Sequence, residues 1–142
     1  MRRIFRKTDS TTDDATQPPV AGARVLVVDD SPTETRIFVK VLTQAGYQVE
    51  TATNGEEAIA IARRSHPDLI LMDVIMPVLN GFQATRMLRR DEVTADIPVI
   101  MVTTKDQQTD RTWGLRQGAV DYLVKPVDAD TLLSRVRAVL EG

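Results

Sequence analysis

The stretch Leu69-Ile-Leu-Met-Asp-Val-Ile-Met-Pro77 decides the fold of this chain. A short continuous apolar run that ends in turn signals is typical of a strand buried on both faces, as in a parallel sheet. We therefore predict a strand over residues 68–73. Asp73 ends this strand, and in open α/β sheets the carboxyl ends of the strands face the crevice that holds ligands. Taken alone, Asp73 fits equally well as a residue that caps or turns the chain, because aspartate is common where strands end.

Four more segments of the chain have the pattern of a strand, and the one over residues 47–51 is short and partly polar. These segments predict strands over residues 24–28, 47–51, 97–102 and 119–124. Helical signals lie between them, such as Ser31-Pro-Thr-Glu34, where serine can cap a helix, proline suits its first turn and glutamate completes a capping box. Strands that alternate with helices five times predict a parallel sheet with helices on both faces. With right-handed crossovers, we predict an α/β fold with a five-stranded doubly wound parallel sheet, (βα)5.

The composition limits what the chain can do. It has 142 residues, of which 42% are hydrophobic and 27% charged, as expected for one globular domain. Cysteine is absent, which excludes disulfides, thiolate metal sites and thiol nucleophiles, and a single histidine, His66, excludes histidine-rich metal sites and histidine-based triads. The net charge of −2 argues against nucleic acid as the main partner. No apolar run reaches the roughly 18–20 residues of a membrane span, so we expect no membrane insertion.

The first 23 residues differ in character from the rest of the chain. Four cations within the first seven residues precede a stretch of Thr, Asp, Ser, Gln and Pro with few apolar residues. Such a segment buries too little apolar surface to offset the entropy of ordering. We therefore predict a disordered N-terminal tail over residues 1–23 and one folded domain over residues 24–142.

Polar residues follow four of the predicted strands. They are Asp29 and Asp30 after the first strand, Asp73 after the third, Thr103 after the fourth and Lys125 after the fifth. Because the carboxyl ends of parallel strands meet at one edge of a sheet, we expect these side chains to lie close together. Three neighbouring carboxylates repel one another, and a hard divalent cation such as Mg²⁺ relieves that repulsion most simply. With Lys125 and the Thr103 hydroxyl to bind a phosphoryl group, the set predicts attack by a carboxylate on phosphorus, which forms an aspartyl phosphate.

Each of these residues also has a plain structural explanation. Asp29 or Asp30 can be an ordinary turn residue, Thr103 can serve turn chemistry, and Lys125 can lie in a solvated loop. The coincidence of polar residues at four strand ends favours the functional interpretation over all of these together.

Residues 24–142 resemble the receiver domain of bacterial response regulators, the CheY-like family. The matching segments are Val25-Leu-Val-Val-Asp-Asp30, Leu71-Met-Asp-Val-Ile-Met-Pro77 with Gly81, Val102-Thr103, and Tyr122-Leu-Val-Lys-Pro126. The resemblance implies the flavodoxin-like strand order 2-1-3-4-5. It also implies a regulator of a two-component phosphorelay that is phosphorylated by a histidine kinase.

The resemblance implies a role for each acidic residue. Asp73 would be the phospho-acceptor, and Asp30 and Asp73 would bind Mg²⁺ directly. The backbone carbonyl of Ile75 would be a further ligand, and Asp29 would act mainly through a bound water.

The same resemblance implies roles for the remaining site residues. Thr103 would hydrogen-bond the phosphoryl group, Lys125 would pair with it, and Tyr122 would be a rotamer switch that turns inward as Thr103 is drawn to the phosphoryl group. A cis peptide bond is implied between Lys125 and the proline that follows it. Ile75 and Lys105 lie where the family tunes hydrolysis of the phosphoaspartate, with a sign that the sequence leaves open.

A closer resemblance is to the stand-alone regulators of type IV pilus twitching motility. It rests on the segments Asp73-Val-Ile-Met-Pro-Val-Leu-Asn-Gly-Phe-Gln-Ala-Thr-Arg86, Thr103-Thr-Lys-Asp-Gln107, Trp113-Gly114 and Arg116-Gln-Gly-Ala119. It implies a cytoplasmic monomer or weak dimer that receives its phosphoryl group from a CheA-like histidine kinase. Because the chain ends at Gly142, we expect no output domain. We expect signalling through a downstream protein bound on a face formed by residues 107–142, or drainage of phosphoryl groups from the kinase, and no enzymatic activity beyond phosphotransfer to itself and autodephosphorylation.

Three other classes of protein use parts of this pattern. Phosphohydrolases of the haloacid-dehalogenase type also combine a strand-end Asp, a Thr, a Lys and Mg²⁺, but they need Asp-x-Asp after the first strand and a capping insertion. Here the first strand ends Asp29-Asp30-Ser31, and no loop is long enough for a cap. A receiver-like scaffold without phosphorylation is disfavoured by the intact acceptor, hydroxyl and lysine. A flavin mononucleotide binder would need a Ser/Thr/Gly-rich phosphate loop after the first strand, and the segment Asp29-Asp30-Ser31-Pro32 at that place does not suit a phosphate.

One predicted helix has little to bury. Residues 104–112 contain no apolar side chain, and the helix over residues 107–117, closed by Gly118, offers only Trp113 and Leu115 to a core. A helix with so few apolar contacts is held less firmly than its neighbours. We predict that it is the moving part of the switch.

Overall fold

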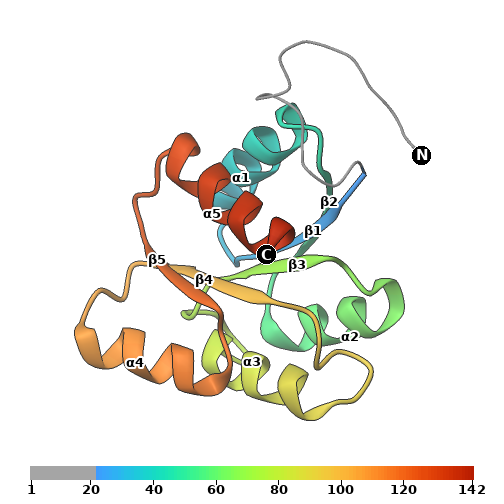
Figure 1. The fold of residues 1–142 in the computed structure, drawn as a ribbon. Coiled ribbons are helices and arrows are strands. Elements are labelled where there is room, and N and C mark those ends of the chain that lie inside the picture. The colour runs from blue at the N-terminus through green and yellow to red at the C-terminus, as the bar shows by residue number, and fades with distance from the viewer. Residues whose placement is uncertain (1–21) are drawn as a thin grey trace.

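The computed structural model describes residues 22–142, in which five parallel strands form one sheet in the order β2-β1-β3-β4-β5 (Figure 1). The elements along the chain are β1 (Arg24–Val28), α1 (Pro32–Gln44), β2 (Gln48–Ala52), α2 (Gly55–Ser65), β3 (Leu69–Met72), α3 (Gly81–Arg90), β4 (Val99–Thr103), α4 (Gln108–Gln117), β5 (Asp121–Val124) and α5 (Ala129–Glu141). The predicted fold class and strand order are both confirmed.

Helices cover both faces of the sheet: α1 and α5 lie on one face, and α2, α3 and α4 on the other (Figure 1). Successive residues of a strand point to opposite faces, so each central strand supplies both cores. On the α1/α5 side the core includes Val25, Val27, Leu69, Leu71, Phe38, Leu42, Leu132 and Val136. On the other side it includes Leu26, Val28, Ile70, Met72, Ala58, Ala62, Ala84 and Leu88. Burial on both faces explains why β3 and the residues of β1 after Arg24 are continuously apolar.

The strands agree with the predicted ranges to within two residues at each end. The largest differences are at the starts of β4 and β5, which begin two residues later than predicted. For β4 the cause is Pro98, which has no N–H to donate to a neighbouring strand, although its carbonyl accepts a hydrogen bond from the Ile70 N–H at 3.0 Å. Tyr47, predicted to open β2, lies just before that strand and is buried in the α1/α5 core.

Side chains cap most helices at their N-termini. Asn54 accepts from the Glu57 N–H at 2.9 Å, Asp128 accepts from the Thr131 N–H at 2.7 Å, and Ser31 accepts from the Glu34 N–H at 3.2 Å. The capping box predicted for α1 is only half right, because the Glu34 side chain does not accept from the Ser31 N–H. The Ser31 N–H donates to Asp29 Oδ1 at 2.9 Å instead, and the Glu34 carboxylate lies toward Lys125.

Helix α4 packs on the sheet through a glycine. Trp113 and Leu115 remain 47% and 46% exposed, so the expectation that they contact the core is wrong. The buried residue of α4 is Gly114, and a Cβ built there would lie 2.9 Å from Met101 Sδ and 3.0 Å from a ring carbon of Tyr122. The absence of a side chain lets the α4 backbone approach the sheet closely, and the larger apolar side chains of α4 are left on the outside.

The described part of the chain begins at the edge of the core. Ala23 is buried, and its carbonyl accepts from the Gln48 N–H at 3.0 Å. The predicted disordered tail covers residues 1–23, of which residues 1–21 lie outside the described range. Among residues 22–142, no helix has the length and apolar character that crossing a membrane requires.

Candidate functional site

The three predicted aspartates meet at the carboxyl edge of the sheet. Asp29 and Asp30 follow β1 and Asp73 follows β3, which is the neighbour of β1. Each offers a carboxylate oxygen, and these oxygens lie within 4.8 Å of one another. Asp29 and Asp73 are 3% and 7% exposed, whereas Asp30 faces solvent. The parallel topology has brought together side chains that are far apart in the sequence.

Lys125 is the cation among these carboxylates. Its Nζ lies 2.7 Å from Asp29 Oδ2 and 3.1 Å from Asp73 Oδ2. The backbone holds the lysine in place, because the Lys125 N–H donates to the carbonyl of Thr103 at 2.8 Å. The peptide bond between Lys125 and Pro126 is cis, as the sequence resemblance implied. The lysine therefore bridges an aspartate of β1 and the aspartate of β3.

The backbone after β3 orients Asp73. Asp73 Oδ1 accepts from the N–H groups of Val74 at 2.6 Å and Ile75 at 3.3 Å, which leaves Oδ2 facing Lys125. The loop then returns so closely that a Cβ built on Gly81 would lie 2.1 Å from the Asp73 carbonyl oxygen. Gly81 also donates its N–H to the Val74 carbonyl at 3.0 Å. The start of α3 is thus fastened to the backbone of Asp73.

The loop between Asp73 and Gly81 contains an unusual backbone conformation. Val78 has a φ of 70° and is 74% exposed. Left-handed conformations are unfavourable for β-branched residues, so Val78 stores conformational strain beside the site.

Burial and charge shift the ionisation of the site in known directions. Burial, the largest contribution, raises the pKa of Asp29, although the bond from Lys125 and the Ser31 N–H act in the opposite direction. Burial alone lowers the pKa of Lys125, but Asp29 and Asp73 together outweigh it and the pKa of Lys125 is raised. The lysine is therefore held in its charged form, and Asp29 gains protons more readily than an exposed aspartate.

The donor set fits a hard divalent cation. Carboxylate oxygens are the ligands that Mg²⁺ prefers, and one exposed carboxylate beside two buried ones leaves room for the waters that Mg²⁺ retains. A single lysine offsets only part of the charge of three carboxylates. The group of Asp29, Asp30 and Asp73 can thus hold a metal ion, while the Ile75 carbonyl as a ligand stays a prediction.

Thr103 and Tyr122 are linked through the loop that leads into α4. Thr103 is fully buried at the end of β4, and its Oγ1 accepts from the Lys105 N–H at a long 3.4 Å. Tyr122 is 1% exposed, and its hydroxyl donates to the Lys105 carbonyl at 2.8 Å. Burial, together with the nearby carboxylate of Asp110, raises the pKa of Tyr122 to about 12, so the phenol stays protonated as a donor. Tyr122 therefore lies inward without a phosphoryl group on Asp73, and its inward turn on phosphorylation stays a prediction.

Two residues near the site were missed from the sequence. The Glu34 Oε1 lies 3.8 Å from Lys125 Nζ, and the guanidinium carbon of Arg111 lies 5.4 Å from the centre of the Tyr122 ring. Glu34 could have been found, because it lies in the first helical turn after the paired aspartates. The amino group of Lys105 pairs with Asp110 at 3.5 Å, so this lysine extends toward the first turn of α4.

Residues 25–137 match the response regulator receiver domain family. The chain belongs to this family. The match includes every site residue described above, from Asp29 to Lys125, and it spans all but the first and last few residues of the folded domain. The receiver domain is therefore a CheY-like signalling module of two-component phosphorelays.

Individual relatives agree with this assignment. The receiver domain is 58% identical over 120 residues to protein PilH of Pseudomonas aeruginosa, a match that covers 84% of this chain and 99% of that protein. The chemotaxis protein CheY4 of Vibrio cholerae superposes with a TM-score of 0.79 at 39% identity, covering 84% of this chain and 99% of the other. The receiver domain of the sensor histidine kinase PA1611 of P. aeruginosa superposes with a TM-score of 0.80 at 34% identity, covering 86% and 100%, and that structure has a magnesium ion in its active-site cleft.

Proposed function

We propose that Asp73 accepts a phosphoryl group from the phosphohistidine of a histidine kinase and that Mg²⁺ is the cation of this site. The observation that supports the proposal most directly is the position of Asp73 Oδ2, which lies 3.1 Å from the Nζ of the partly buried Lys125 and within a group of three carboxylates. A buried carboxylate with one oxygen fixed by two amide donors and the other facing a cation is oriented for attack on phosphorus. Asp30, Asp73 and the Ile75 carbonyl would hold the metal directly, with Asp29 acting through a water.

The transfer step moves one phosphoryl group between two side chains. Asp73 Oδ2 forms the new P–O bond while the P–N bond to the kinase histidine breaks, and the electron pair of that bond returns to the imidazole nitrogen. Lys125 moves its hydrogen bonds from the carboxylate to the phosphoryl oxygens, where the Thr103 hydroxyl is a second donor. Bound Mg²⁺ would supply charge neutralisation on the transferring oxygens.

The added charge would change the contacts of the loop before α4. A phosphoryl group brings about −1.5 to −2 charge and strong acceptors, which draw the Thr103 hydroxyl away from the weak bond with Lys105. Tyr122 is bonded to the carbonyl of the same Lys105, so a movement of this loop changes how tightly the tyrosine is held. The phosphoryl group thereby biases a two-state element that includes α4. Its readout is the face built from residues 107–142, where a downstream protein would bind.

The phosphoryl lifetime would depend on residues at the mouth of the site. Ile75 is 55% exposed, so its side chain can shield the phosphoaspartate from water. Lys105 is the second such residue, and its pairing with Asp110 sets how freely its amino group reaches the site.

We place the protein in the control of type IV pilus twitching motility, on the strength of its similarity to PilH. In this assignment it is a cytoplasmic monomer or weak dimer, and a CheA-like kinase is the phosphodonor. It acts through a bound partner or as a phosphate sink, and it catalyses only phosphotransfer to itself and its own dephosphorylation.

Intact-mass analysis tests the proposal directly. The protein is incubated with acetyl phosphate and Mg²⁺, and we expect one phosphoryl adduct that is lost in Asp73→Asn and after chelation of the metal. Asp106→Asn, in the exposed loop before α4, is the matched control and should retain the adduct. An adduct of equal size in Asp73→Asn, or none in the wild type, contradicts the proposal. Sustained turnover of free phosphate esters would point to a phosphohydrolase instead.

A further inference from the structure

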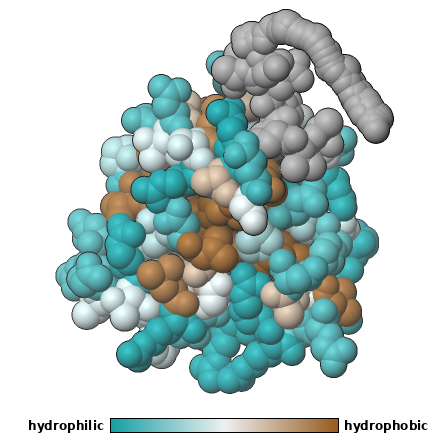
Figure 2. Space-filling model, viewed as in Figure 1, coloured by the Kyte–Doolittle hydropathy of each residue, from teal (hydrophilic) through white to brown (hydrophobic). Residues whose placement is uncertain are grey.

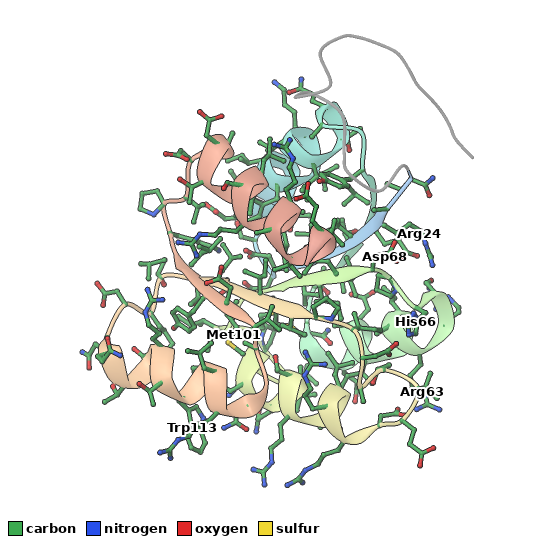
Figure 3. All side chains as sticks on the ribbon, in the orientation of Figure 1. Arg24, Arg63, His66, Asp68, Met101 and Trp113 are labelled. Carbon is green, nitrogen blue, oxygen red and sulfur yellow. The ribbon has the colours of Figure 1, made fainter. Side chains whose placement is uncertain are left out.

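The outer faces of α3 and α4 form a groove lined with arginine. Arg86, Arg89 and Arg90 recur at helical spacing on α3, and Trp113, Arg116 and Gln117 recur with the same spacing on α4. The two stripes line one groove of about 410 Å³ that contains no acidic residue. Figure 3 shows Trp113 projecting from α4 on the side away from the sheet. In Figure 2 the lower edge of the molecule, where α3 and α4 lie, is largely teal, with some brown and white side chains among the hydrophilic ones.

Three of the four arginines in this groove are free to bind a ligand. The fourth, Arg89, already binds the backbone: its guanidinium donates to the carbonyls of Gly118 at 3.0 Å, Ala95 at 2.5 Å and Ile97 at 2.8 Å. The side chains of Arg86, Arg90 and Arg116 are exposed and form no ion pair or hydrogen bond with any other residue in the range 22–142. On a chain with a net charge of −2, three unpaired cations around a half-exposed tryptophan are a concentrated positive patch.

We propose that this arginine groove, defined by Arg86, Arg90, Trp113 and Arg116, is a docking site for an acidic segment of a partner protein. Guanidinium groups bind carboxylates through paired hydrogen bonds, and arginine and tryptophan are the residues most enriched at the energetic centres of protein interfaces. A carboxylate-rich segment would neutralise the arginines, and an apolar side chain of that segment would cover the indole of Trp113.

The shape of the groove favours a peptide over a small anionic ligand. Pockets for small molecules are concave and mostly apolar, with a few polar groups that fix the orientation of the ligand. Here the charged side chains are exposed on the outer faces of two helices, and Trp113 is the one apolar surface between them. Such a lining suits an extended or helical segment laid along the groove, with carboxylates on either side of one apolar residue.

The groove adjoins the element proposed as the switch. Trp113 precedes Gly114, the residue of α4 that contacts Tyr122 and Met101. A displacement of α4 on phosphorylation would move Trp113 and Arg116 relative to Arg86 and Arg90, so the affinity for the acidic segment would change. This coupling rests on the proposed phosphorylation of Asp73, whereas docking to the unphosphorylated protein does not.

Binding of a defined peptide tests the groove. The probe is a short dye-labelled peptide of Glu and Asp residues around one central Leu, and its matched control replaces every acidic residue by Lys. We expect a rise in anisotropy with the acidic peptide alone, weakened by added salt. Trp113 is the only tryptophan of the chain, so a change in its intrinsic fluorescence reports binding at the groove itself.

Charge-reversal variants locate the binding surface. Arg90→Glu and Arg116→Glu should each weaken binding about three- to tenfold, since each turns an attraction into a repulsion. Lys40→Glu, which makes the same change of charge on the far side of the sheet on α1, should leave it unaltered. Equal loss in Lys40→Glu, or no binding by the wild type, overturns the proposal. Tighter binding of inorganic tripolyphosphate than of the peptide also overturns it, in favour of a phosphate ligand.

The coupling is measured in a separate arm. The peptide affinity is compared with and without acetyl phosphate and Mg²⁺, using Asp73→Asn as the control. A change confined to the wild type supports the coupling. Unchanged affinity in a sample shown by mass to be phosphorylated refutes the coupling but leaves the docking site intact, and the absence of an adduct refutes the proposed function alone.

Discussion

Replacement of Gly81 by alanine should displace the backbone of Asp73. The new Cβ would lie 2.1 Å from the Asp73 carbonyl oxygen, about 1.3 Å short of the 3.4 Å at which ordinary van der Waals contact begins. It would also lie 2.9 Å from the carbonyl carbon of Asp73 and from Val74 Cα. All three are backbone atoms of a buried segment, so no side-chain rotation can relieve the clash. The start of α3 and the end of β3 must move apart.

The expected cost follows from this geometry. Overpacking of a well-packed core costs about 1–3 kcal/mol, and a clash with backbone belongs in the upper half of that range. For a domain of this size, 2–3 kcal/mol lowers the Tm by about 8–12 °C. Displacement of a reacting group by about 1 Å can slow a reaction by about 10²-fold, so we expect a similar loss in the rate of phosphorylation of Asp73.

Thermal unfolding and time-resolved intact-mass analysis measure the two effects. Gly114→Ala is the matched control, because its Cβ meets the flexible end of Met101 at 2.9 Å and an aromatic ring, both outside the acidic site. It should lose about 1 kcal/mol and retain a phosphorylation rate within a few-fold of the wild type. A Gly81→Ala variant that matches the wild type in both Tm and rate would refute the argument that α3 is fastened to the Asp73 backbone.

Three further predictions concern single side chains. Asp29→Asn should raise the free energy of unfolding at neutral pH. Burial raises the pKa of Asp29 above 3.8, so the stability contributed by its protonated form is complete below pH 3.8 and is lost as the pH rises through the folded-state pKa. Equal urea midpoints of variant and wild type at neutral pH would contradict this. Arg89→Met should cost about 2–4 kcal/mol in urea unfolding, because three backbone carbonyls lose their donor, whereas the exposed Arg64→Met should be nearly neutral. Tyr122→Phe should cost about 0.5–1.5 kcal/mol through loss of the bond to the Lys105 carbonyl while Asp73 still forms the adduct; loss of the adduct would show that the hydroxyl serves the chemistry itself.

The fold and the acidic site can be predicted from the sequence because both depend on strong local signals. Strands buried on two faces must be continuously apolar, and a polar residue directly after such a strand is placed at the ligand edge by topology alone. The sequence alone therefore groups Asp29, Asp73 and Lys125, and in the structure Lys125 hydrogen-bonds both aspartates.

Other parts of the molecule depend on atoms that a sequence pattern does not display. The partner of the Tyr122 hydroxyl is a backbone carbonyl, and the closest contact of α4 with the sheet is made by a residue without a side chain. Neither leaves an apolar or charged periodicity, so the sequence pattern predicts core contacts for Trp113 and Leu115, whereas the buried residue of α4 is Gly114. The local sequence predicts a capping box for Glu34, whereas the proximity of its carboxylate to Lys125 depends on where the chain after β5 lies relative to the first turn of α1.

The conformation of Val78 has a consequence for engineering. An L-residue in a left-handed conformation costs about 1–2 kcal/mol, and glycine would avoid this cost at an expense of about 0.5–1 kcal/mol in chain entropy. Val78→Gly should thus recover up to about 1.5 kcal/mol at a position that is 74% exposed. The loop therefore offers a place where the thermal tolerance of the domain can be raised without altering a carboxylate, the lysine or the groove.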